Sequence, residues 1–197
     1  MADDKHDTDL PEDDPNYRAP AEKALKEILE TDKEDESLQK YKAALLGDGA
    51  TGSAIIIDEK DPRKVIPKVL ILKVDGRGDV ELDLTGDLGK LKEKPFTIKE
   101  GVSYQMEIVF YVQREIVAGL KYVQGTYRKG IRVDKDSWMI GSYGPKKESQ
   151  SYTTPADEAP SGMIARGSYT VKSTFIDDDK TEHLKWEWTF DIKKDWD

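Results

Sequence analysis

The spacing of hydrophobic residues changes once along the chain, from a helical period to the two-residue period of a β-strand. In the first part, two short apolar stripes with helical spacing follow each other. They consist of Leu25, Ile28 and Leu29, and of Leu38, Tyr41, Leu45 and Leu46. These stripes predict helices at about 21–30 and 34–46. Isolated helices of this length are marginal in water, so the segment must fold against its own domain or against a partner.

Local signals set the limits of these two helices. Thr31 and Glu34 have the spacing of a capping box, and Gly47 suits the end of the second helix. The chain before Tyr17 has too few apolar residues to offset the entropy of ordering and is predicted to be disordered. After Gly47, further glycines and Pro62 indicate a linker.

From Val65 onward the apolar residues alternate with polar ones, as in strands with one buried face. The clearest run lies near the C-terminus, where Trp186, Trp188, Phe190 and Ile192 alternate with polar side chains. Similar runs recur between clusters of Gly, Asp and Pro, and no convincing helix interrupts them. The pattern predicts an all-β protein: an antiparallel sandwich or barrel of the immunoglobulin-like type over residues 65–197, preceded by a flexible arm with two short helices over residues 1–60.

Charge separates the same two parts. Residues 1–60 hold 17 acidic and 8 basic residues, so the formal net charge of −9 lies entirely there. An acidic, flexible segment disfavours nucleic acid and anionic lipid, and it favours a basic protein partner or solubility alone. The acidic N-terminus lacks the features of a signal peptide, and no apolar run is long enough to cross a membrane. The sequence therefore predicts a cytoplasmic protein without stable membrane insertion.

Residues for catalysis or metal binding are scarce. The chain has no cysteine and two histidines, and it lacks phosphate-binding and nucleophile-elbow motifs. The acids at 177–179 lack the spacing of a calcium loop, and His183 fits a structural role better than a lone acid or base. We therefore expect no enzyme, no metal and no cofactor. The aromatic strand near the C-terminus fits either a filled core or a sandwich that admits an apolar ligand.

Several blocks of sequence resemble the Rho GDP-dissociation inhibitor family. They follow one another in order from about Tyr17 to the C-terminus, and together they are highly specific. The blocks are residues 32–42, 44–47, 82–88, 126–130, 141–145, 177–181, 186–188 and 192–196.

The resemblance implies a lipid site and a GTPase site. The fold is expected to be an immunoglobulin-like antiparallel β-sandwich with an N-terminal flexible helix-loop-helix arm. The two sheets are expected to part around a geranylgeranyl group. The arm is expected to grip the switch regions of a GDP-bound, geranylgeranylated Rho, Rac or Cdc42-type GTPase in a 1:1 complex. The implied lipid residues are Ile71, Phe96, Tyr104, Ile108, Phe110, Ile116, Val171, Trp186, Trp188 and Phe190. The implied switch contacts are Tyr17, Asp35, Leu38, Tyr41, Leu45 and Asp179. Asp157, Glu158, Asp177 and Asp178 are expected to receive the basic tail of the GTPase.

Two further points follow from the resemblance. Pro95 stands where some relatives have a phosphorylatable serine, whereas Ser168 remains a candidate for such regulation. The alternative function is a general prenyl or lipid carrier of the phosphodiesterase-delta type. Carriers of that type share the sandwich but lack the arm, so the arm distinguishes the two functions.

Overall fold

The computed structural model describes residues 36–37, 40 and 55–196. Glu36, Ser37 and Lys40 are helical, and they lie within residues 34–46, where the sequence predicts the second helix of the arm. The other residues of the arm before residue 55, including the predicted helix at 21–30, lie outside the described residues. The described strands and the single 3-10 helix among them are β1 (Val65–Val74), β2 (Val80–Asp83), η2 (Leu88–Lys92), β3 (Phe96–Lys99), β4 (Ser103–Val112), β5 (Val117–Arg128), β6 (Ile131–Tyr143), β7 (Gln150–Thr153), β8 (Asp157–Glu158), β9 (Gly167–Ile176) and β10 (Glu182–Lys193).

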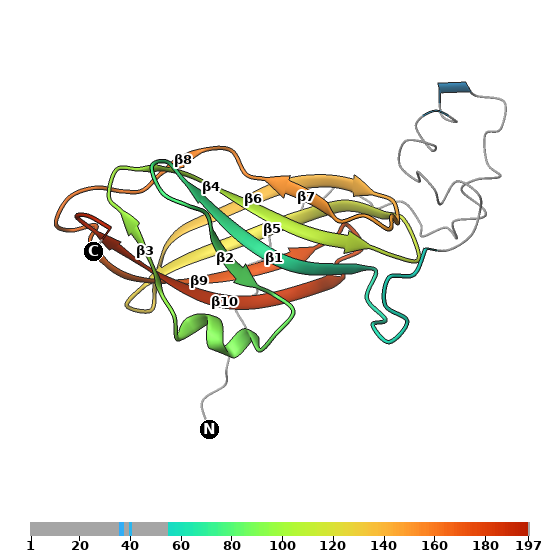
Figure 1. Ribbon diagram of the computed structural model, residues 1–197, viewed down its shortest axis with the longest axis horizontal. Coiled ribbons are helices and arrows are strands. Elements are labelled where there is room, and N and C mark those ends of the chain that lie inside the picture. Colours follow the sequence, from blue (N-terminus) through green and yellow to red (C-terminus); the bar gives the residue numbers. More distant parts are fainter. Residues whose placement is uncertain (1–35, 38–39, 41–54, 197) are drawn as a thin grey trace.

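The strands form two sheets that face each other (Figure 1). One sheet has the order β2-β1-β4-β7, with β8 pairing with the start of β4, and the other has the order β3-β10-β9-β5-β6. The predicted β-sandwich is confirmed. One pairing differs from the antiparallel prediction, because the short β3 runs parallel to β10.

The core lies between the sheets and follows the predicted alternation. Leu70 and Leu72 of β1 are buried, and so are Trp186, Trp188 and Ile192 of β10. Their burial removes a large apolar area from water, which is the main favourable contribution to folding. Among the described residues, the largest fully buried side chains include Tyr122, Phe110 and Phe175.

Residues 55–64 form hydrogen bonds with the turn between β4 and β5, although the sequence predicts a linker there. The side-chain oxygen of the buried Gln113 accepts the N–H groups of Ile57 and Asp58 at 2.9 and 3.0 Å. The Gln113 amide donates to the carbonyls of Asp61 and Arg63, both at 2.8 Å. The folded domain therefore includes residues before β1. No helix in the described part of the chain is long and apolar enough to cross a membrane.

Candidate functional site

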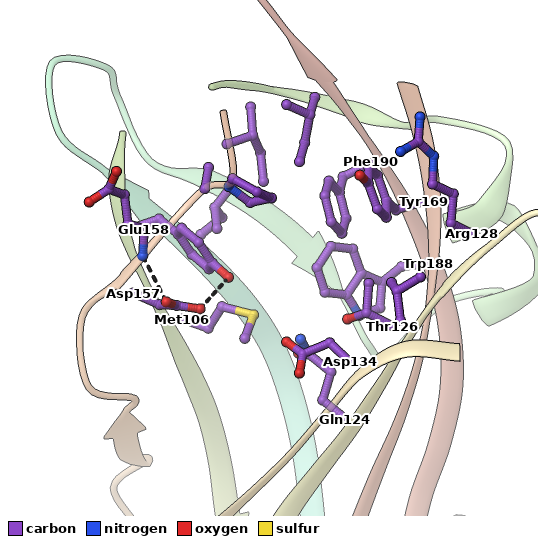
Figure 2. Close-up of a pocket in the computed structure, with 17 residues that line it drawn as sticks. Met106, Gln124, Thr126, Arg128, Asp134, Asp157, Glu158, Tyr169, Trp188 and Phe190 are labelled. Carbon is purple, nitrogen blue, oxygen red and sulfur yellow. Dashed lines mark hydrogen bonds between the residues drawn. The ribbon is translucent and has the colours of Figure 1, made fainter. Parts of the chain in front are cut away.

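A cavity of about 390 Å³ opens between the sheets at one end of the sandwich (Figure 2). Both sheets and the segment after β8 contribute to its walls. Its lining residues are Leu72, Ile98, Tyr104, Met106, Gln124, Thr126, Arg128, Val133, Asp134, Asp157, Glu158, Ala159, Pro160, Tyr169, Trp188, Phe190 and Ile192. The volume falls in the range of pockets that hold small apolar ligands.

Stacked aromatic rings form one wall of the cavity. Tyr169 of β9 lies nearly parallel to Phe190 of β10, with ring centroids 5.0 Å apart. Phe96 of β3 stacks on Trp188 at 5.1 Å and on Phe190 at 6.4 Å. Such rings offer a large apolar surface at little cost in conformational entropy, so this wall suits a hydrocarbon chain.

A buried polar network lies behind the aromatic wall. The Trp188 indole N–H donates to Ser173 Oγ at 3.0 Å, and the Ser173 hydroxyl lies 3.0 Å from the Tyr122 hydroxyl. Tyr122 in turn donates to Gln124 Oε1 at 3.1 Å. Burial raises the pKa of Tyr122, so its hydroxyl stays protonated and keeps this donor role. The network fixes the orientation of Trp188 in the cavity wall.

Carboxylates gather at the mouth of the cavity. The Tyr104 hydroxyl donates to Asp157 Oδ2 at 3.0 Å, which holds Asp157 at the edge of the first sheet. Asp134 lines the cavity from β6, and Asp136 follows on the same strand. Burial, with the negative charges of Asp134 and Asp157, raises the pKa of Asp136 to about 6. Asp134, Asp136 and Asp157 are therefore close enough for their charges to interact.

The structure divides the predicted lipid residues into three groups. Tyr104, Trp188 and Phe190 line the cavity, and Phe96 stacks behind the last two. Deeper core positions are occupied by Ile108, Phe110, Val171 and Trp186, all of which are buried. The remaining two lie elsewhere: Ile71 alternates with the buried residues Leu70 and Leu72 on β1, and Ile116 lies in the turn before β5, at the other end of the sandwich.

Sequence reasoning missed other lining residues. Leu72, Met106 and Ile192 belong to strands whose alternation was recognised, so their inward direction was available from the period. Gln124 and Thr126 are polar but buried in β5. An alternation of apolar and polar residues could therefore not predict that these two side chains line the cavity.

The acids predicted to receive a basic tail lie at opposite ends of the sandwich. Asp157 and Glu158 are exposed at the cavity mouth. Asp177 is buried beside His183, and Asp178 forms an ion pair with Lys121 at 3.0 Å. Both follow the far end of β9, ~30 Å from its start. This location separates Asp177 and Asp178 from the mouth, because the turn that contains them caps the other end of the sheet.

Most predicted switch contacts cannot be placed. Tyr17, Asp35, Leu38, Tyr41 and Leu45 lie outside the described residues. The sixth, Asp179, is exposed in the turn between β9 and β10. No cluster of three metal-ligating side chains occurs within the described ranges.

Comparison with known proteins gives one consistent result. The family model described as "RHO protein GDP dissociation inhibitor" matches residues 2–195. Human Rho GDP-dissociation inhibitor 1 is 53% identical over 181 residues, covering 92% of this chain and 87% of the relative. Human Rho GDP-dissociation inhibitor 3 is 47% identical over 182 residues, covering 92% of this chain and 79% of the relative.

A more distant likeness appears among solved structures. A Niemann-Pick type C2 protein from the Japanese carpenter ant aligns with a TM-score of 0.42 and 10% sequence identity, over 70% of this chain and 99% of that one. A likeness this distant says nothing about function.

Proposed function

Because the chain belongs to the Rho GDP-dissociation inhibitor family and shares its regulatory function, we propose how it acts on its partner. It binds a GDP-bound, geranylgeranylated Rho-family GTPase as a 1:1 complex in the cytoplasm. The geranylgeranyl group enters the cavity between the sheets, and the arm holds the switch regions. The observation that carries the proposal is the aromatic-walled cavity of about 390 Å³ at the open end of the sandwich.

The cavity makes lipid extraction possible without driving it strongly. A geranylgeranyl chain has about twenty carbons, and at ~0.8 kcal/mol per buried CH₂ its transfer from water is worth on the order of 15 kcal/mol. Transfer from a bilayer to the cavity exchanges one apolar environment for another, so most of that free energy cancels. The free energy for extraction must therefore come from further contacts between the two proteins.

The carboxylates of the mouth supply one such contact. A basic segment before the lipid of the GTPase is held to an anionic membrane at ~1 kcal/mol per Lys or Arg. Asp157 and Glu158 lie exposed where the lipid would enter, with Asp134 on the facing wall. These acids can replace the lipid headgroups as partners of the basic segment.

The arm supplies the remaining contacts. We assign the switch contacts to Tyr17, Asp35, Leu38, Tyr41 and Leu45, with Asp179 adding a carboxylate from the sandwich. Folding of the arm on the partner carries its own entropic cost, which the new contacts must exceed. Release of GDP requires the switches to loosen, so a clamp on them slows nucleotide release. This inhibition requires no catalytic residue.

The lipid assignment is tested by filling the cavity. Ala159 is buried in the lining, so Ala159→Phe should place a ring in the space for the lipid. Ala156 is exposed three residues earlier, and Ala156→Phe is the matched control. We expect Ala159→Phe to weaken binding of a geranylgeranyl-cysteine peptide by at least about tenfold, which is ~1.4 kcal/mol.

The same pair of variants separates this function from a general lipid carrier. An inhibitor of this family should slow GDP release from an unprenylated GTPase, and Ala159→Phe should leave that weaker effect intact. Equal peptide affinity for both variants would refute the cavity assignment. A wild-type chain that binds the peptide but never slows GDP release would favour the carrier.

A further inference from the structure

Four large apolar side chains project into solvent around the cavity mouth. Ile131 and Val133, at the start of β6, are 71% and 53% exposed. Met163 and Ile164, in the loop between β8 and β9, are 83% and 88% exposed. Exposed apolar groups that gather beside a ligand cavity mark an interaction site more often than isolated ones do.

Hydrogen bonds hold the two segments together. The Arg128 guanidinium, at the end of β5, donates to the carbonyl oxygens of Ile164 and Arg166. The same guanidinium lies 5.3 Å from the ring centroid of Tyr169, whose hydroxyl donates to the Ala165 carbonyl at 2.6 Å. The apolar tips are therefore presented on a fixed loop beside the β5–β6 turn. Both segments lie at the end of the sandwich where β10 ends (Figure 1).

The β5–β6 turn is basic, in contrast to the chain as a whole. Residues 128–135 contain four basic side chains and one acid, Asp134, whereas the whole chain has a net charge of −9. Arg132 follows Ile131 directly and Lys129 precedes it by two residues, and all three are exposed. Apolar tips between cations are the arrangement that peripheral proteins use in the headgroup layer of an anionic membrane.

The mouth thus has two walls of opposite character. Figure 2 shows Asp157 and Glu158 on one side of the cavity and Arg128 on the other. The acidic wall suits a basic peptide and repels lipid phosphate, whereas the basic, apolar side attracts lipid phosphate. Arg128 and Val133 line the cavity as well as this second side, so the surface is continuous with the entrance for the lipid.

We propose that Ile131, Val133, Met163 and Ile164, together with the cations of residues 128–135, form a membrane-contacting rim. The rim inserts into the headgroup layer of an anionic membrane while the adjacent cavity takes up the prenyl chain from that same surface. This inference rests on the proposed function and adds the lipid surface as a second partner. The lipid chain then passes from bilayer to cavity without crossing open water.

The test measures binding of the full chain to vesicles in the absence of any GTPase. We expect it to bind vesicles of phosphatidylcholine with about one-third phosphatidylserine more tightly than pure phosphatidylcholine vesicles, and less tightly as salt rises. The double change Ile131→Ser and Ile164→Ser should weaken binding to the anionic vesicles by roughly tenfold or more, because both apolar tips are lost. Neither residue lines the cavity.

Met139→Ser is the matched control, since Met139 is 56% exposed on the same strand, eight residues from Ile131. It should leave vesicle binding unchanged. The proposed membrane contact would be refuted if the wild type does not bind anionic vesicles. It would also be refuted if the wild type and the double variant bind them equally. A double variant that binds a prenylated GTPase more weakly in solution without vesicles would also overturn it, in favour of a protein contact.

Solution measurements keep this inference separate from the proposed function. Binding of a geranylgeranyl-cysteine peptide and inhibition of GDP release are followed without membranes. Failure of the wild type in those two measurements counts against the proposed function. If the wild type succeeds in both solution measurements but does not bind vesicles, only the proposed membrane contact is refuted.

Discussion

Asp177 holds the turn between β9 and β10 through both oxygens of its carboxylate. Oδ1 accepts the Thr181 N–H at 2.9 Å, and Oδ2 lies 2.8 Å from His183 Nε2. The His183 carbonyl also accepts a hydrogen bond from Arg63 at 3.3 Å, which ties the turn to the segment before β1. Asp179 is exposed in this turn, so the buried pair sets the position from which Asp179 can meet a partner.

The first prediction concerns the stability that Asp177 provides. Burial raises the pKa of Asp177, but hydrogen bonds from His183 and the Thr181 N–H outweigh burial and lower the pKa below its usual 3.8. A carboxylate with a depressed pKa stabilises the fold above its unfolded pKa and loses that contribution as pH falls through the folded pKa. We expect Asp177→Asn to lower the free energy of unfolding by about 2 kcal/mol at neutral pH.

Urea unfolding at a series of pH values measures this effect. The gap between wild type and Asp177→Asn should shrink as the pH falls below 3.8. Asp179→Asn, an exposed neighbour, should change stability by less than about 0.5 kcal/mol. A gap that stays constant down to the acid range would contradict the assigned pKa.

Three consecutive acids in this turn illustrate what sequence could not predict at the level of single residues. Residues 177–179 were expected to face a partner, yet Asp177 is buried, Asp178 pairs with Lys121 and only Asp179 is exposed. A register shift between Glu182 and Leu184 accompanies the burial of His183 at the start of β10. Such a shift depends on the pairing of strands and leaves no mark in the local apolar pattern.

At the level of elements, β3 depends on the aromatic contacts of Phe96. The strand has four residues and pairs with β10, and it places Phe96 against Trp188 at 5.1 Å and Phe190 at 6.4 Å. Parallel pairing of so short a strand offers few hydrogen bonds, so the stack must contribute much of its attachment.

The second prediction tests this attachment. Phe96→Ala should destabilise the protein by about 3–4 kcal/mol, because it removes a large buried ring and leaves a void behind the cavity wall. Hydrogen exchange should rise in β3 far more than in β9. Pro95→Ala changes an exposed neighbour and serves as the control. Uniform exchange across both strands would show that β3 does not open separately.

Strand prediction succeeded where one face alone was buried. β1, β4 and β10 alternate regularly, and their positions followed from the period of two. The period is the same in parallel and antiparallel strands, so it did not indicate that β3 runs parallel to β10. β5 is buried on both faces over much of its length, which hides the polar cavity residues it contributes.

At the scale of the whole molecule, the third prediction concerns residues 55–197 without the preceding chain. The two sheets and the segment fastened by Gln113 lie within this range, so the fragment should fold. It should bind a geranylgeranyl-cysteine peptide as the full chain does, yet fail to slow GDP release. Because lipid transfer from a membrane is nearly neutral, it should also extract prenylated GTPase poorly.

Parallel assays of nucleotide release and membrane partition check this division. Extraction by the fragment as efficient as by the full chain would show that the cavity alone drives the process. A fragment that unfolds would show that residues before Ile55 belong to the core.

Under the proposed function, the distance between the two ends of the sandwich sets a minimum length for the lipid-bearing tail of a partner. Asp179 and the segment beginning at Ile55 lie at one end, whereas the cavity opens at the other, ~30 Å away along β9. A partner held at the first end must reach the second with its own tail. At ~3.3–3.6 Å per extended residue, that span needs about nine residues between the globular part of the partner and its lipid. Under the proposed function, we expect a partner whose tail is shorter than this span to leave the cavity empty.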